Sequence, residues 1–327
     1  MGEIRVSHLG KSFQVSKRGS GMKAAIKQFF KKEYETVQAL RDVSFHINSG
    51  ELVGYIGPNG AGKSTTVKIM SGILTPSEGS SEVDGLTPYK DRKEHVKNIG
   101  VVFGQRSQLW WDVPVIDSFE LLKDIYKIPE DNYESMKNRL IHKLQLADFM
   151  NTPVRQLSLG QRMRCELAAS LLHNPPVLFL DEPTIGLDAI SKLAVRDFIK
   201  EINTEFGTTV ILTTHDMDDI EALCTRIIVI GKGQILYDGH MQGLREMVTT
   251  ERKLIVDFSS EVRRPELDDA RLIETDGMKA TFYFDPTKVK ASELIKICAS
   301  KYEVEDVLVH PVSIEEIIAK LYKVLGI

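Results

Sequence analysis

The stretch LVGYIGPNGAGKST, residues 52–65, decides the fold of this chain. Its last nine residues, 57–65, contain the eight-residue pattern G-x-x-x-x-G-K-[ST]. The apolar residues before this pattern predict a buried strand, and residues 64–70 predict a helix that ends at Gly72. A strand, a glycine-rich loop and a helix form the setting in which the pattern binds phosphate. The sequence therefore predicts a binding site for a nucleoside triphosphate.

The residue types in this loop suit the phosphate chain of such a ligand. Glycines let backbone N–H groups approach the phosphates, and the start of the helix adds a partial positive charge. Lys63 supplies a positive charge for the β- and γ-phosphates, and the hydroxyl of Ser64 is placed to bind Mg²⁺. The predicted phosphate-binding residues are Gly57, Pro58, Asn59, Gly60, Ala61, Gly62, Lys63, Ser64 and Thr65.

Composition places the chain among globular proteins with a sizeable core. It has 327 residues, of which 42% are hydrophobic and 27% charged, and this length suggests about two domains. A net charge of -4 gives no overall field that recruits nucleic acid, so we expect no nucleic-acid partner. The sequence contains no apolar run of the ~18 residues that span a bilayer and no secretory signal, and its three scattered cysteines suggest reduced thiols. We therefore expect a cytoplasmic protein, which could still dock on a membrane protein.

Strands that alternate with helices predict an α/β fold with a sheet core. We expect this core over residues 1–248, with an inserted helical subdomain at residues 113–172. The apolar pattern restarts after residue 248, which predicts a small C-terminal α/β domain at residues 249–327. This second domain contains no motif that indicates chemistry.

Residues 16–36 form a basic insertion in the strand-rich start of the chain. Apolar residues and lysines fall there on different faces of a predicted helix. Basic amphipathic helices of this kind lie on membrane surfaces or dock on partners. The alternative is a surface helix that packs its apolar face on its own domain, and the sequence does not choose between the two.

Two further stretches carry residues suited to phosphate chemistry. Residues 177–182, VLFLDE, form an apolar strand that ends in Asp181, which suits Mg²⁺ binding through water, and Glu182, which suits orienting or deprotonating the attacking water. Residues 157–161, LSLGQ, precede a predicted helix, and Ser158 and Gln161 fit an S-x-x-Q capping box. By itself the capping box indicates only a helix start.

In this combination the motifs resemble those of the ATP-binding domain of ABC transporters, whose signature sequence is usually LSGGQ. The resemblance covers residues 3–240, with the motifs in the family's order. Ser158, Gly160 and Gln161 match the signature, whereas Leu159 replaces its third residue, a glycine. The resemblance implies a P-loop NTPase core of the ABC ATPase type.

Three more residues match the family's motifs. Gln105 follows a predicted strand and resembles the Q-loop glutamine, which reaches Mg²⁺ and the attacking water. Asp188 lies in Gly-Leu-Asp and resembles the D-loop aspartate. His215 resembles the switch histidine, which contacts the γ-phosphate and Glu182. The resemblance thus implies catalytic roles for Glu182, His215 and Gln105, with Ser64, Gln105 and Asp181 at Mg²⁺.

The family's mechanism needs a second ATP-binding subunit. Two such domains face each other head to tail, so that the phosphate loop of one and the signature of the other close on each ATP. The start of a helix at Ser158 would offer the γ-phosphate a second positive dipole. ATP then favours the closed dimer, and hydrolysis lets it open. Because this chain carries every motif, we expect a homodimer, although the sequence does not exclude a heterodimer.

The sequence offers two candidates for the residue that stacks on adenine. Relatives carry an aromatic residue near the first strand, where base–aromatic contact contributes about 1–3 kcal/mol. Phe13 and Tyr34 are the two candidates, and we favour Phe13 because it ends the predicted first strand.

The loop after Gln105 indicates how the chain meets its partner. Residues 106–112, RSQLWWD, contain both tryptophans of the chain. If exposed, they would anchor the coupling helix of a transmembrane permease subunit; if buried, they would pack the helical subdomain. Together with LSLGQRMR and the C-terminal domain, this stretch resembles the drug-exporter branch similar to daunorubicin-resistance ATP-binding proteins.

We therefore predict the ATP-hydrolysing subunit of an exporter, attached through permease subunits to the cytoplasmic face of the membrane. The alternative is a soluble ABC ATPase that acts on ribosomes or DNA. Those relatives generally carry two ATPase domains or long coiled coils, whereas this chain has one phosphate loop and no sustained heptads. A P-loop kinase would lack the motifs at Ser158 and His215.

Overall fold

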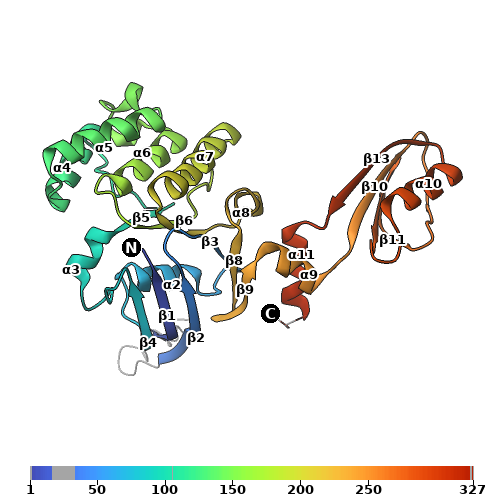
Figure 1. Cartoon of the computed structure of the whole chain (residues 1–327), viewed down its shortest axis with the longest axis horizontal. Coiled ribbons are helices and arrows are strands. Elements are labelled where there is room, and N and C mark those ends of the chain that lie inside the picture. The colour runs from blue at the N-terminus through green and yellow to red at the C-terminus, as the bar shows by residue number, and fades with distance from the viewer. Residues whose placement is uncertain (1, 17–33, 105, 325, 327) are drawn as a thin grey trace, which may run out of the picture. The chain divides into compact units, whose positions relative to one another are not determined.

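The computed structural model describes residues 2–16, 34–104, 106–324 and 326 (Figure 1). Residues 17–33 of the basic insertion and the predicted Q-loop residue, Gln105, lie outside these described residues. Residues 16 and 34–36, at the two ends of the insertion, are described and belong to strands. The chain divides into two compact units, Met1–Gly239 and His240–Ile327.

The first unit is built around a six-stranded sheet in the order β5-β6-β7-β3-β8-β9 (Figure 1). The ladders from β5 through β6, β7 and β3 to β8 are all parallel. Short runs of Val, Ile and Leu form these strands, and β3 and β7 are buried along their whole length, as expected for strands covered on both faces. The strands are β3 Leu52–Ile56, β5 Ile99–Phe103, β6 Val177–Asp181, β7 Thr209–Thr213, β8 Arg226–Gly231 and β9 Gln234–His240.

Helices connect these strands and form the predicted helical subdomain. The helices α4, α5 and α6 lie together in Figure 1 and fall within residues 113–172. The helices of this unit are α2 Lys63–Met70, α3 Arg92–His95, α4 Val115–Tyr126, α5 Glu130–Lys143, α6 Leu159–Leu171, α7 Ala189–Phe206 and α8 Met217–Leu223.

A three-stranded antiparallel sheet, β2-β1-β4, completes the unit. Its apolar side chains join those of β3 and α2 in one buried core. The ladder between β1 and β2 extends beyond this core as far as the pair Ser16 and Tyr34. The strands are β1 Ile4–Ser16, β2 Tyr34–Ile47 and β4 Glu78–Val83.

The second unit contains a four-stranded antiparallel sheet, β11-β12-β10-β13, with its own core. Alternate residues of β10, from Leu254 to Phe258, are buried against α10. The helix α9 also belongs to this unit because it packs on α11, so the division falls after Gly239 and not after residue 248. The elements are α9 Met241–Val248, β10 Arg252–Phe258, β11 Ala270–Asp276, β12 Lys279–Phe284, α10 Ala291–Lys301, β13 Val304–Pro311 and α11 Ile314–Val324.

Among the helices of the described residues, none combines the length and apolar character that a bilayer crossing requires.

Candidate nucleotide-binding site

The predicted motifs meet at one edge of the six-stranded sheet. The strands β3, β5, β6 and β7 are parallel, so the segments that follow them emerge at the same edge. In open α/β sheets this edge is where ligands bind. The phosphate loop follows β3, Gly104 follows β5, Glu182 follows β6, and His215 comes two residues after β7.

The phosphate loop needs glycine at several of its positions. Gly60 and Gly62 have φ angles of 80° and 112°, in the region that residues with a side chain rarely adopt. A Cβ atom on Gly57 would lie 2.3 Å from the backbone oxygen of Ile230. At Gly60, in contrast, a Cβ would meet nothing within 4 Å, so the backbone there is open to a ligand.

Lys63 lies across this loop at the start of α2. Its Nζ donates to the backbone oxygens of Gly57, at 2.6 Å, and Pro58, at 3.2 Å. Burial lowers the pKa of this ammonium, while the carboxylates of Glu182 and Asp181 act in the opposite direction. A buried cation that faces two carboxylates is suited to binding a phosphate with a metal ion beside it.

A cavity of about 530 Å³ opens beside the loop. Its volume suits a nucleotide-sized ligand. The residues that line it are Asn59, Ser64, Lys68, Ile73, Phe103, Gly104, Arg106, Asp181, Glu182, Ile185 and His215.

The cavity offers oxygen ligands that fit Mg²⁺. The hydroxyl of Ser64 and the carboxylate of Asp181 share its lining, and Asp181 accepts a hydrogen bond from the hydroxyl of Thr213. Within the described part of the chain, no group of three or more His, Cys, Asp or Glu side chains could hold a metal ion. This sparse set fits an ion that takes its other ligands from phosphates and water.

Glu182 and His215 form a polar pair in this cavity. The Oε1 atom of Glu182 lies 2.6 Å from Nε2 of His215, so the contact predicted for them is present. Glu182 has a φ of 58°, a left-handed conformation that is uncommon for a residue with a side chain. Its backbone N–H donates to the oxygen of Thr213 at 2.8 Å, which ties the end of β6 to β7. A carboxylate here is suited to activating a water molecule, and the histidine to orienting it.

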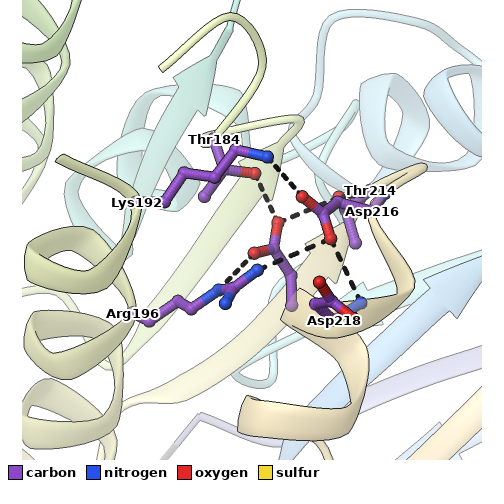
Figure 2. A network of polar contacts seen from close by, with 7 residues as sticks. Thr184, Lys192, Arg196, Thr214, Asp216 and Asp218 are labelled. Atoms are coloured by element: carbon purple, nitrogen blue, oxygen red, sulfur yellow. Dashed lines mark hydrogen bonds and ion pairs between the residues drawn. The ribbon is translucent and has the colours of Figure 1, made fainter. Parts of the chain in front are cut away.

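A network of charged residues and threonines, which the sequence analysis did not identify, includes Thr184 and Thr214, close in sequence to the two members of this pair (Figure 2). Asp216 caps α8 and binds Lys192 and Arg196 of α7. Burial raises the pKa of Asp216, but the hydrogen bond from Lys192 and the positive charges of Lys192 and Arg196 together outweigh this effect, so the pKa lies below its usual range. Asp219 is completely buried and accepts from Thr184, Thr214 and Arg196.

The signature sequence forms the start of α6. Both halves of the predicted capping box are present: Gln161 N–H donates to Ser158 Oγ at 3.2 Å, and Ser158 N–H donates to Gln161 Oε1 at 2.9 Å. A Cβ atom on Gly160 would lie 2.4 Å from Oγ of Ser191, so only glycine lets α6 approach α7 this closely. Asp188 caps α7 and accepts from Ser191, contacts that hold the pKa of Asp188 below its usual range.

Leu159, the departure from the usual signature, has a place in this packing. A Cβ atom added to Gly186 would lie 2.9 Å from Cδ2 of Leu159, so the two residues are in close contact. Gly186 also has a φ of 70°, which favours glycine. Leucine at this position therefore packs on the loop before α7. Ser158, Gly160 and Gln161 do not belong to the lining of the cavity.

The two candidates for the adenine contact lie at different distances from the phosphate loop. Phe13 pairs with Val37, which lies two residues before Ala39 on the neighbouring strand. The backbone oxygen of Ala39 lies close to Gly62 of the phosphate loop. Tyr34 lies five residues before Ala39, which is about 16 Å along an extended strand. Neither aromatic residue lines the cavity.

The two tryptophans are exposed, by 40% for Trp110 and 51% for Trp111. Their loop is held on α6 by Glu166, whose carboxylate accepts from the hydroxyl of Ser107 and from the N–H of Gln108 at 3.0 Å. Glu166 is 4% exposed, and burial raises its pKa, while these hydrogen bonds act in the opposite direction. The sequence analysis did not identify this residue.

The guanidinium of Arg162, next to the signature, lies 5.7 Å from the ring of Trp111. The exposed loop and the signature helix are thus one packed structure.

Comparisons with known proteins agree with this geometry. Residues 40–185 match the family model described as ABC transporter. The chain is 32% identical to the ABC transporter ATP-binding protein NatA of Bacillus subtilis, over 72% of this chain and 95% of that protein. It is 34% identical to the methionine import ATP-binding protein MetN 2 of Enterococcus faecalis, over 69% of this chain and 66% of that protein.

Among solved structures, the chain is similar to the dimeric post-hydrolysis state of the ATP-binding cassette MJ0796 bound to ADP and Pi. The TM-score is 0.60 at 27% identity, over 73% of this chain and 98% of that one.

Proposed function

We propose that this chain, which belongs to the ABC transporter family of ATP-binding proteins, drives export through separate permease subunits. The chain is an ABC ATPase that energises transport. The observation that carries the catalytic assignment is the pair of Glu182 and His215, 2.6 Å apart in the cavity beside the phosphate loop.

In this proposal each residue of the cavity has one task. Lys63 and the backbone of the phosphate loop hold the β- and γ-phosphates of ATP. Glu182 takes a proton from the attacking water, and His215 orients the water and the γ-phosphate. Mg²⁺, held by Ser64, Asp181 and Gln105, would neutralise charge that develops on the phosphate oxygens. Of the two adenine candidates, we favour Phe13 because it lies nearer to the phosphate loop along the strands.

A second copy of the chain completes the site. Ser158 lies outside the cavity of its own chain, so its helix start is available to the γ-phosphate bound by a partner. The dimeric state of MJ0796 supports this arrangement. ATP contacted from both sides would hold two chains together, and loss of the γ-phosphate would release them.

The surface that carries Trp110 and Trp111 is our candidate for the permease contact. Both indoles are exposed, and large aromatic side chains are the usual anchors of interfaces. Their attachment to α6 would pass a motion at the interface to the signature. We assign the direction as export from the resemblance to drug exporters, although relatives such as MetN 2 carry import in their names. This placement would put the chain on the cytoplasmic face of the membrane.

Co-purification tests this proposal. From detergent-solubilised membranes of its own cell, the tagged chain should retain a multispanning membrane protein. Trp110→Ala/Trp111→Ala should lose that partner and keep ATP hydrolysis, since neither residue lines the cavity. In inverted vesicles that contain both subunits, ATP should drive cargo inward for an exporter. Ribosomal subunits or DNA as the retained partner, or cargo movement out of such vesicles, would contradict the proposal.

A further inference from the structure

Asp219, on α8, is a fully buried carboxylate that connects three parts of the chain. Its Oδ2 atom accepts from the hydroxyls of Thr184 and Thr214, the latter at 3.2 Å. Its Oδ1 atom accepts from Nε of Arg196, on α7, at 2.5 Å. All three neighbours donate, which is the arrangement that an ionised carboxylate requires.

The two threonines belong to the segments that carry the catalytic pair. Thr184 comes two residues after Glu182, and Thr214 directly precedes His215. The hydroxyl of Thr214 also accepts from the N–H of Asp216 at 3.0 Å, so the backbone is fixed on both sides of His215.

The positions of the two side chains depend on how these two segments are held. The side chain of His215 is 46% exposed, so packing does not fix its position. Glu182 has a left-handed backbone conformation, which persists only where surrounding contacts impose it. Small shifts of the two segments would change the distance between the pair, and a displacement of about 1 Å at such a site can lower a rate by about 100-fold.

We propose that Asp219, oriented by Arg196, is a positioning residue that sets the geometry of Glu182 and His215 for ATP hydrolysis. The inference rests on the proposed catalytic role of that pair. Asp219 acts on the chemical step and leaves ATP binding intact, because the phosphate loop makes none of these contacts. Through Arg196 the same carboxylate is joined to α7, which packs on Gly160 of the signature.

The test compares Asp219→Asn with Asp218→Asn in the full-length protein. Asn keeps the size of the side chain but turns one acceptor into an N–H₂ donor, which faces either Arg196 or the two hydroxyls. We expect Asp219→Asn to lower kcat by about 10- to 100-fold and to change the Kd for ATP by less than about threefold. Asp218 lies one residue away and is exposed; its part in Figure 2 is its backbone N–H, so Asp218→Asn should keep the wild-type kcat.

Thr184→Val and Thr214→Val remove the two hydroxyls and leave the contact with Arg196 in place. We expect each of these variants to lower kcat, as Asp219→Asn does. The double variant Thr184→Val/Asp219→Asn should lose no more than Asp219→Asn alone, because the threonine acts through the carboxylate. Circular dichroism and thermal melts separate this effect from unfolding, and if Asp219→Asn does not fold, the valine variants decide.

A merely structural role would lower the melting temperature and leave kcat per folded molecule unchanged. That result, or an equal loss of kcat and ATP affinity, would overturn the inference. ATP turnover by the wild-type protein would still uphold ATP hydrolysis, on which the proposed function depends. A folded wild-type chain that binds ATP but shows no turnover under any condition would overturn the proposed function, and the inference with it.

Discussion

His173 is a buried imidazole outside the catalytic site, and it should make the fold sensitive to acid. Its Nε2–H donates to the oxygen of Ile99 at 2.9 Å, and its ring stacks on Tyr126 with the centroids 4.0 Å apart. Burial lowers the pKa of His173 to about 4, although the hydrogen bond to Ile99 acts to raise it. Protonation would place a second N–H donor at Nδ1, which has no partner among the described residues.

The sign of the effect on stability follows from proton binding. The unfolded chain binds this proton near the ordinary histidine pKa of about 6.5, whereas the folded chain binds it only near 4. Between these values the unfolded state holds more protons, so the free energy of unfolding falls as the pH falls. We expect His173 to contribute a loss of about 2 kcal/mol between about pH 7 and about pH 5.

Urea unfolding of His173→Gln at these two pH values measures this contribution. Gln can keep a hydrogen bond to Ile99 but cannot take up the proton, so the variant should lose about 2 kcal/mol less than wild type. His142→Gln, on the exposed face of α5, is the matched control and should retain the wild-type slope. Identical slopes for His173→Gln and wild type would rule out His173 as the source of acid sensitivity.

At the scale of elements, Glu166 joins the tryptophan loop to α6. In Glu166→Gln, an N–H₂ group replaces one carboxylate oxygen. The side chain can then no longer accept from both the hydroxyl of Ser107 and the N–H of Gln108. We expect the loop to loosen. Trp110 and Trp111 are the only tryptophans of the chain, so tryptophan fluorescence, excited selectively over that of tyrosine, reports on this loop alone.

Acrylamide quenching measures the loosening. The quenching constant of Glu166→Gln should rise by about one half or more, because a buried donor or acceptor without a partner costs about 1–3 kcal/mol and favours an open loop. Asp117→Asn, at an exposed position in the first turn of α4, should quench as wild type does. Equal quenching in all three proteins would mean that Glu166 does not hold the loop.

The elements also show what could be predicted from the sequence. The phosphate loop and the strand that ends at Glu182 are contiguous segments whose patterns carry their own structural context, so the fold class and the position of the cavity followed from them. Asp219 and Glu166 could not be found this way. Their partners Thr184 and Ser107 lie 35 and 59 residues away, and a single acidic residue on a helix gives no sign of such contacts.

At the scale of the whole molecule, the two halves of the proposed site lie apart within one chain. Glu182 and residues of the phosphate loop line the cavity, whereas Ser158 lies at the N-cap of α6, outside the cavity lining. If a second chain supplies Ser158, a variant that binds ATP without hydrolysing it should accumulate as a dimer. Glu182→Gln should lower kcat by at least about 100-fold, the usual contribution of a general base, and should sediment as a dimer with ATP and Mg²⁺.

The contribution of Ser158 can be tested without loss of its helix cap. Aspartate caps helices as well as serine does, so Ser158→Asp should fold normally while placing a negative charge next to the γ-phosphate bound by the partner. We expect Glu182→Gln/Ser158→Asp to bind ATP with an affinity close to that of Glu182→Gln and yet to remain monomeric in analytical ultracentrifugation. ADP should leave both variants monomeric, because it lacks the γ-phosphate that both chains contact. A monomeric Glu182→Gln variant saturated with ATP would exclude a homodimeric site, and a dimeric double variant would exclude the contact at Ser158.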